Sequence, residues 1–423
     1  MKKSKIYSAF LILYIIKISL SLALKSFNYQ GDSSPEIEDL ILQFFSPEDI
    51  EKGRAYHRDG FFVSLISFAI HTFIFLSLIF TSLGSKLENF FLKLTNGSNP
   101  KAVFLFFSSI YSLIFLLNLP FSFYFGYILE HRHGFSNMDI SFFFLTQFKT
   151  FLISCITISL VTSSISFLVE KFPVRWNLIL PFAGTVFIFI SVLLYPYLIL
   201  PVYYDVQAPE DPGLKLRISQ LLEKEGIVTD QVYVIRESAY SGHTNAFFTG
   251  FGKEKKIYLY DTLLEKNTER EILSILGHEA GHWKGNHSLY SILMSFFVLG
   301  IGSLLLKLLL EKCKENSIFH IRNFAYPTSI LFSFFLYSLF SFYFSPLESY
   351  LSRQMEIYAD REALRMTNDP DAFVSAEIKL ARDNKSRLDP HRFVVFFYHS
   401  HPTALDRIRM AIEYKESNQT INP

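Results

Sequence analysis

The sequence predicts a mainly α-helical, multi-pass membrane protein, and its composition and hydrophobic patterning are the observations that predict it. Of the 423 residues, 50% are hydrophobic and 19% are charged, and the charged share is below the roughly 25% of typical soluble domains. Phenylalanine alone occurs 47 times, which is more than a water-exposed surface normally carries. About seven apolar runs have the roughly 20 residues that a helix needs to cross a bilayer.

Most of the predicted transmembrane helices lie in the N-terminal half of the chain. They are expected near Tyr7–Leu24, Phe61–Leu83, Ala102–Leu129, Phe148–Val169, Trp176–Tyr203, Leu289–Leu310 and Phe324–Phe344. So many long runs with so few charges argue against a large soluble protein with buried core helices. Residues 26–58 are acidic and contain Ser-Pro pairs, so we expect an extramembrane loop there.

A long amphipathic segment, residues 205–287, predicts structure outside the membrane. Its expected elements are a helix at Pro212–Glu225, strands at Gln231–Ile235 and Lys256–Tyr260, and a helix from near Thr268 through Trp283. After the last apolar run, residues 346–416 have the pattern of helices with polar faces.

The residues that carry chemistry lie in the string His278-Glu279-Ala280-Gly281-His282. Positions i and i+4 share one face of a helix, so both imidazoles can bind one metal ion. Glu279 can then act on a water molecule at that metal, as in the H-E-x-x-H pattern of zinc peptidases. Two surface histidines are the alternative explanation of so short a pattern.

A catalytic zinc site takes three protein ligands and keeps a fourth position open, so another ligand must come from elsewhere in the chain. Glu356 and Asp360 are four residues apart on a predicted helix. Glu356 would bind the metal, and Asp360 would hold the second ring nitrogen of a ligating histidine and so fix its tautomer. Spacing alone leaves open an exposed helix face on which these carboxylates pair with Arg353 and Arg361.

Together these strings resemble the integral-membrane zinc peptidases of the type I CAAX prenyl protease family, which includes the yeast a-factor converting enzyme. The resemblance runs through most of the chain. Its strongest pieces are His278–His287, Ser352-Arg353 with Glu356 and Ala359-Asp360, Asn245–Gly250, His401-Pro402 with Arg407, Leu119–Ser122, and Glu130 with His133-Gly134-Phe135. It implies a fold in which seven helices enclose an intramembrane chamber, with a zinc metallopeptidase domain that carries a small β-sheet.

On this basis the chain divides into four parts. They are a membrane region with five transmembrane helices at 1–204, the first part of the metallopeptidase domain at 205–287, two further transmembrane helices at 288–345, and the second part of the metallopeptidase domain at 346–423.

The resemblance also implies roles that spacing alone cannot assign. Asn245 and Ala246 would form an edge strand that holds the substrate backbone. His401 would help to stabilise the oxyanion, and Arg407 would position Asp360 or His401. An ordinary strand edge, a helix cap and a plain surface arginine are the respective alternatives.

We therefore expect an endopeptidase with one Zn²⁺ per chain, bound by His278, His282 and Glu356, and with Glu279 as the general base. Its partners would be a peptide or protein substrate and the lipid bilayer. The net charge of +1 gives no indication of a nucleic-acid partner. Both CAAX processing and quality control of membrane proteins stay open as its task. The other classes considered are a non-enzymatic chaperone or transporter with the same fold and a zinc-dependent membrane oxidoreductase.

The protein would lie in the inner or plasma membrane of a bacterium or in the endoplasmic reticulum of a eukaryote. The resemblance places the catalytic part in the cytosol. The short loops on the N-terminal side of the membrane, away from the catalytic part, carry more lysines and arginines. The positive-inside rule would place those loops in the cytoplasm, so that the catalytic part faces outward. The sequence gives no indication of the oligomeric state.

Overall fold

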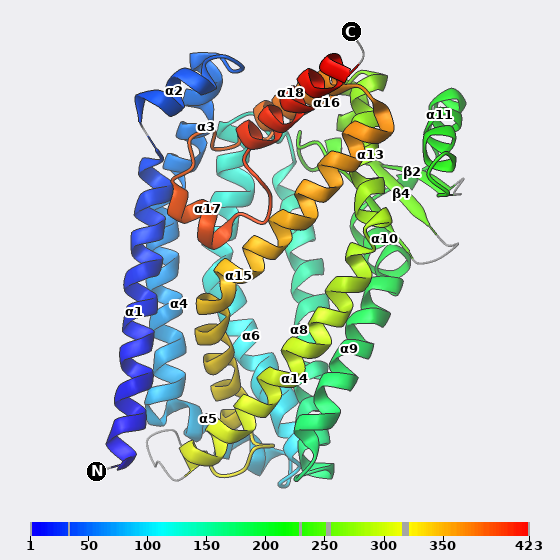
Figure 1. Cartoon of the computed structure of the whole chain (residues 1–423). Coiled ribbons are helices and arrows are strands. Elements are labelled where there is room, and N and C mark those ends of the chain that lie inside the picture. The colour runs from blue at the N-terminus through cyan, green and yellow to red at the C-terminus, as the bar shows by residue number, and fades with distance from the viewer. Residues whose placement is uncertain (1, 33, 228–230, 251–254, 315–320, 422–423) are drawn as a thin grey trace.

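The computed structural model describes residues 2–32, 34–227, 231–250, 255–314 and 321–421, and most of them are helical (Figure 1). Within these residues, 7 helices are long and apolar enough to cross a membrane. They run over Ser8–Gln30, Pro47–Phe80, Asn99–Arg132, Ile140–Lys171, Trp176–Tyr203, His287–Cys313 and Pro327–Thr367. The prediction of a mainly α-helical, multi-pass membrane protein is confirmed.

The N-terminal half is a series of helices joined by short turns. Its elements are α1 (Lys2–Gln30), α2 (Pro35–Ile41), α3 (Pro47–Asp59), α4 (Phe61–Phe80), α5 (Ser82–Leu94), α6 (Asn99–Phe123), η1 (Tyr124–Leu129), α7 (Glu130–Arg132), α8 (Ile140–Lys171), α9 (Trp176–Leu194), η2 (Tyr195–Ile199) and α10 (Leu200–Tyr203). Phe73 and Leu178 expose 73% and 70% of their surface, as expected for helices that face lipid.

Residues 26–58, whose place outside the membrane stays a prediction, are largely helical. Helix α1 continues to Gln30, and α2 and α3 occupy much of the remaining segment. Helix α3 begins with a capping box, in which Ser46 accepts from the Asp49 backbone and Asp49 accepts from the Ser46 backbone. The prolines that suggested a loop stand at the first turns of α2 and α3, where a missing N–H has no helical partner to lose.

A small sheet lies between the two groups of membrane helices in the sequence. Its strands are β1 (Val206–Gln207), β2 (Gln231–Ile235), β3 (Ala246–Thr249) and β4 (Lys256–Tyr260), in the order β1-β2-β4-β3. Strands β2 and β4 are parallel, and β3 runs antiparallel to β4. The two predicted strands are confirmed as β2 and β4. Strand β1 has too few residues to show an alternating pattern.

Helices α11 (Pro212–Glu223) and α12 (Asp261–Lys266) flank this sheet, and α13 (Glu269–Lys284) packs beside it. Helix α13 begins where the sequence predicts because Thr268 and Glu271 form a capping box there. Its buried residues Ile272, Leu276 and Ala280 share one hydrophobic core with the sheet and α11.

The C-terminal half contains α14 (His287–Lys314), α15 (Pro327–Thr367), α16 (Pro370–Asp383), α17 (Arg392–Tyr398) and α18 (Ala404–Ile421). The predicted division between residues 345 and 346 falls inside α15, which continues through Pro346 without a break. Membrane helices tolerate proline where neighbouring groups satisfy the freed backbone. One helix therefore reaches from the membrane into the metallopeptidase part.

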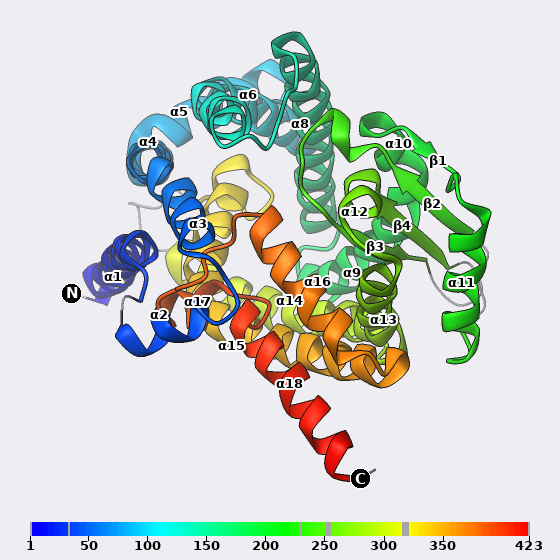
Figure 2. The same ribbon diagram turned by 90° about the horizontal axis from the view of Figure 1, so that it is seen from above.

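Seen from above, the long helices are arranged in a ring, and the sheet lies at the side of it next to α13 (Figure 2). A cavity of about 420 Å³ lies between α1, α4, α6 and α15. A second cavity of about 760 Å³ lies between α9, α14 and strand β3. A single chamber that joins these spaces stays a prediction.

Two glycines on α13 allow it to lie very close to α15. A Cβ atom added to Gly281 would stand 2.7 Å from the Cα and 2.8 Å from the carbonyl oxygen of Ala359, and one on Gly277 would stand 3.2 Å from the Cα of Ala363. These contacts are with backbone atoms, which cannot move aside without moving α15. The distance between the two helices therefore depends on the absence of side chains at these positions.

We predict that Gly281→Ala separates α13 from α15 and destabilises the protein by about 1–3 kcal/mol, the usual cost of overpacking a core. Melting temperature and bound metal of the purified variant should both fall. Gly300→Ala is the matched control, because a Cβ at Gly300 meets no atom within 4 Å. A Gly281→Ala protein with wild-type melting and metal content would contradict this account of the helix contact.

Candidate metal centre

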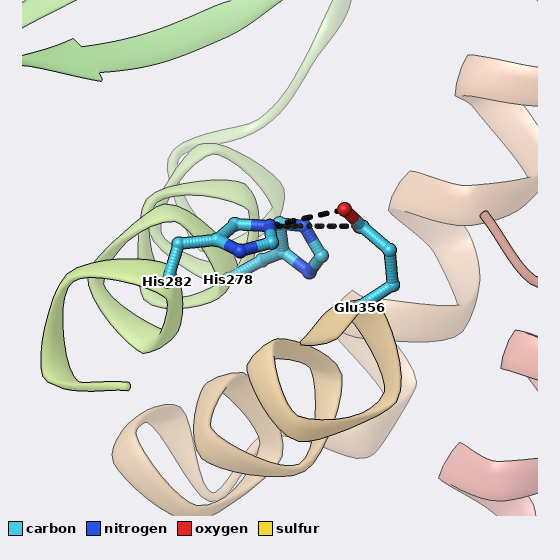
Figure 3. A group of neighbouring side chains, drawn as sticks. All are labelled: His278, His282 and Glu356. Atoms are coloured by element: carbon cyan, nitrogen blue, oxygen red, sulfur yellow. Dashed lines mark hydrogen bonds and ion pairs between the residues drawn. The ribbon is translucent and has the colours of Figure 1, made fainter. Parts of the chain in front are cut away.

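Helices α13 and α15 bring His278, His282 and Glu356 together (Figure 3). The Nε2 atoms of the two histidines lie 3.1 Å apart. Glu356 Oε2 lies 3.2 Å from Nε2 of His278, and Glu356 Oε1 lies 3.4 Å from Nε2 of His282. One ligand atom from each residue falls within 4.8 Å of the others. The spacing of the ligands in the sequence thus corresponds to one compact group in space.

The chemistry of this group suits a divalent metal ion. Two imidazoles and one carboxylate are a common ligand set of catalytic zinc sites. Glu356 Oε2 is buried and makes no hydrogen bond of good geometry, although Nε2 of His278 lies 3.2 Å away. Two facing Nε2 atoms at 3.1 Å cannot both carry a proton between them. A cation would satisfy the oxygen and both nitrogen lone pairs, which are otherwise costly to bury.

Asp360 lies behind His278 and is fully buried. Its Oδ1 is 2.6 Å from Nδ1 of His278, so that nitrogen donates to the carboxylate and leaves Nε2 free to face the metal site. Nε of Arg407 donates to Asp360 Oδ2 at 2.9 Å, and Nη1 of Arg407 lies 2.7 Å from Glu377 Oε2. The sequence leaves open whether Arg407 positions Asp360 or His401. In the structure its hydrogen bond is to Asp360.

His401 reaches the same site from the segment before α18. Its Nε2 lies 3.3 Å from Glu356 Oε2, and its Nδ1 lies 2.8 Å from Ser400 Oγ. When the hydroxyl donates to Nδ1, the ring proton of a neutral imidazole is on Nε2, which faces the centre. Burial lowers the pKa of His401, although the Glu356 carboxylate acts in the opposite direction.

Strand β3 is an edge strand of the sheet and lies next to His278, His282 and Glu356. Asn245 and Ala246 border a cavity of about 130 Å³ that also touches His278 and Glu279. Phe247–Gly250 border the cavity of about 760 Å³, together with Glu279, His282 and Glu356. Glu279 therefore stands between a small and a large cavity, with the strand along both.

Comparison with known proteins places this arrangement in a family. A model of "Peptidase family M48" matches residues 209–415, and one of "CAAX prenyl protease N-terminal, five membrane helices" matches residues 32–205. A protein of Schizosaccharomyces pombe named "Probable CAAX prenyl protease 1" is 30% identical over 331 residues, which cover 76% of this chain and 67% of the relative. The chain belongs to peptidase family M48. It is a zinc metalloprotease with a multi-pass membrane part.

Other comparisons agree with this membership. A "CAAX prenyl protease 1 homolog" of Arabidopsis thaliana is 26% identical over 396 residues, or 89% of this chain and 90% of the relative. The crystal structure of S. mikatae Ste24p superposes with a TM-score of 0.79 at 23% identity and covers 95% of this chain and 98% of that chain. At that identity the superposition supports the fold. Family membership argues against both non-peptidase alternatives, the chaperone or transporter and the oxidoreductase.

The carboxylates around His278 in this M48 peptidase stabilise a positive charge at the site. Burial alone would lower the pKa of His278, but the nearby carboxylates of Asp360 and Glu356 raise it to about 10. A positive charge at this place is therefore strongly stabilised by the two carboxylates. Burial raises the pKa of the Glu279 carboxyl, and the neighbouring imidazoles oppose that shift. A carboxylate with a raised pKa is a better proton acceptor.

The sequence assigns no role to two residues near the centre, His287 and Glu377. Nδ1 of His287 lies 2.8 Å from Nδ1 of His282, so His287 can hold the ring of that ligand. Helix α13 ends at Lys284, and Asn286 takes a left-handed conformation with φ of 52°, so helical spacing could not indicate this contact. Glu377 pairs with Arg407 and borders the small cavity, and no local pattern marks it.

We predict that the wild-type peptidase contains about one equivalent of zinc and that Asp360→Asn weakens zinc affinity about 10- to 100-fold, the range for partners of ligating histidines. Affinity is measured by competition with a chelator of known strength. Asp371→Asn is the control, because the Asp371 side chain is 67% exposed and pairs with Lys415 on the surface. Equal affinities in Asp360→Asn and wild type would remove Asp360 from the metal site.

Proposed function

We propose that this M48 peptidase is an endopeptidase that binds one zinc ion through His278, His282 and Glu356 and uses Glu279 as its general base. The observation that carries the proposal is the convergence of three ligand side chains, within 4.8 Å, beside Glu279 and an open strand edge. We further propose that its substrates end in a CAAX sequence with a prenylated cysteine.

Zinc bound at this centre would supply Lewis acidity, which polarises a peptide carbonyl and makes water more acidic. Glu279 lies at the junction of both cavities, where it accepts a proton from the attacking water. It then returns that proton to the leaving amine as the peptide bond breaks. His278 and His282 stay neutral as ligands, and Asp360 holds His278 in the tautomer that this requires.

His401 would stabilise the oxyanion that forms on the carbonyl oxygen. Its Nε2 lies close to the ligand group, 3.3 Å from Glu356 Oε2. Its side chain is 60% exposed, so a substrate can reach it. A donor placed at the developing negative charge stabilises the transition state more than the ground state.

Strand β3 would hold the main chain of the substrate. The backbone N–H of Tyr260 donates to the carbonyl of Asn245 at 3.0 Å, and the antiparallel register pairs Phe247 with Tyr258. Because hydrogen-bonded and non-hydrogen-bonded pairs alternate, the backbone groups of Ala246 and Phe248 point away from β4. Among the described strands, none pairs with that side, so an extended peptide can add there.

The two cavities favour different groups on either side of the cleaved bond. The large cavity is bordered by Ile188 and Val192 of membrane helix α9 and by Tyr195, the first residue of η2. It suits a long apolar group such as an isoprenoid on a cysteine. The small cavity is bordered by the apolar Phe373, Ala376 and Leu380 and also by the charged Glu377 and Arg407. Its apolar side would take an aliphatic side chain. The names of the relatives as CAAX prenyl proteases support this assignment.

We predict that Glu279→Gln retains zinc but loses nearly all cleavage of a quenched-fluorescent CAAX peptide, because the base is lost and the ligands remain. Glu265→Gln, an exposed change on α12, is the control and should cleave normally. Metal analysis and turnover are measured on the same preparations. Near-normal turnover in Glu279→Gln would exclude it as the base, and equal cleavage of prenylated and unprenylated peptides would exclude the proposed substrate class.

A second prediction concerns the strand edge. Ala246→Pro should raise KM or abolish cleavage of peptides of unrelated sequence alike, with zinc content unchanged. Proline removes the outward-facing Ala246 N–H, which donates to Asn245 Oδ1 at 2.9 Å and would exchange that partner for the peptide, and proline also restricts the strand. Methylating backbone nitrogens of the peptide removes the complementary bonds, in which a peptide N–H donates to an outward-facing carbonyl of β3. Normal cleavage of the N-methylated peptides would show that β3 does not bind the substrate main chain.

A further inference from the structure

One motif of the sequence has no part in the proposed chemistry. Glu130 and the following His133-Gly134-Phe135 come from the membrane half, yet they lie against residues 240–243 of the metallopeptidase half. The Gly242 N–H donates to the carbonyl of Phe135 at 2.5 Å, and Ser136 Oγ donates to the carbonyl of Tyr240 at 2.6 Å. Two segments more than a hundred residues apart are thus joined by one backbone–backbone and one side chain–backbone hydrogen bond.

His243 is at the centre of this junction. Its Nε2 lies 3.3 Å from Glu130 Oε2, and its Nδ1 lies 2.9 Å from Asn384 Oδ1. Its ring stacks on Phe135 with centroids 4.2 Å apart. Tyr56 on α3 donates to the other oxygen of Glu130 at 2.7 Å. A protonated His243 can donate to Glu130 Oε2 and to Asn384 Oδ1 at the same time. It then bridges two segments that lie far apart in the chain.

The segment held in this way leads directly into the strand edge. Strand β3 begins at Ala246, three residues after His243. The carbonyl of His243 accepts from Thr262 Oγ1 at 2.6 Å, and the carbonyl of Gly242 accepts from Lys266 Nζ at 2.6 Å. One end of β3 is therefore fixed both to the sheet and to the membrane half.

We propose that His243 is a positioning residue for the substrate: its bridge between Glu130 and Asn384 fixes the start of β3, so that the membrane half sets the position of the peptide-binding edge beside the metal centre. The proposal rests on the proposed function of β3 as the strand that binds substrate. His243 does not contact the ligands, and its effect is on substrate binding and not on the metal.

Charged and titratable groups face this junction from every element packed against it. They are Tyr56 on α3, Glu130 on α7, Glu237 on η3 (Glu237–Ala239), Lys266 on α12 and Lys385 after α16. Burial lowers the pKa of His243, but the bonds to Glu130 and Asn384 raise it above its ordinary value of 6.5. The bridge is therefore complete at and below that pH and is lost as the pH rises through the raised pKa.

The test is a double-mutant cycle on a prenylated CAAX peptide that the wild-type protein cleaves. His243→Gln and Glu130→Gln should each raise KM about tenfold, the order expected when a charge-assisted hydrogen bond is lost. The double variant should be no worse than either single variant, because both remove the same bond. Zinc content and kcat should stay within about twofold of wild type, and KM of wild type alone should rise at alkaline pH.

His131→Gln is the matched control, because His131 is adjacent to Glu130 but bonds its own helix through the Tyr127 carbonyl. Wild-type KM in both single variants would overturn the inference and leave the proposed function intact. Absence of zinc-dependent cleavage by the wild type would instead overturn the proposed function, and the inference with it.

If a variant is too unstable for kinetics, hydrogen–deuterium exchange of Glu130→Gln in the absence of peptide tests the same contact. Residues 240–250 should then exchange faster than in wild type, whereas α13 should not change. Equal exchange over residues 240–250 would also overturn the inference.

Discussion

The close contact of α13 with α15 is the constraint on which the site depends. Gly277 and Gly281 present no side chain to α15, and Ala359 and Ala363 lie opposite them. This brings the face of α13 that carries His278 and His282 within reach of Glu356 and Asp360. Since ligand atoms must meet to within a few tenths of an ångström to share one metal ion, the helix distance decides whether the centre forms.

The contact of α13 with α15 also buries the charged Asp360 side chain. Ion pairs around Asp360 offset the free-energy cost of burying it. Asp360 has no exposed surface, and a lone buried carboxylate would be costly. Arg407 compensates it and is itself compensated by Glu377. Removing one member of such a group leaves an unpaired charge and is more damaging than the net contribution of the group suggests. The network thus acts more to fix the orientation of His278 than to add stability.

The membrane helices take part in the site as well as anchoring it. Helix α9 borders the large cavity next to β3, and α15 carries Glu356, the proposed third metal ligand, on a continuous helix that is long and apolar enough to cross a membrane. The division of the chain into membrane and peptidase parts therefore describes the sequence better than the structure. Residues of both parts border the large cavity beside the candidate metal centre.

The sequence by itself determined the long membrane helices, strands β2 and β4, and the candidate ligands that share helix α13. The long apolar runs predict membrane helices because lipid accepts no exposed backbone polar groups, and His278 and His282 follow from helical periodicity alone. Only the tertiary structure decided which segments meet. His287 reaches His282 because the chain turns at Asn286, and Glu377 meets Arg407 through packing of α16 on α18. Local periodicity fixes geometry within a helix, whereas contacts between distant segments depend on how the whole chain packs.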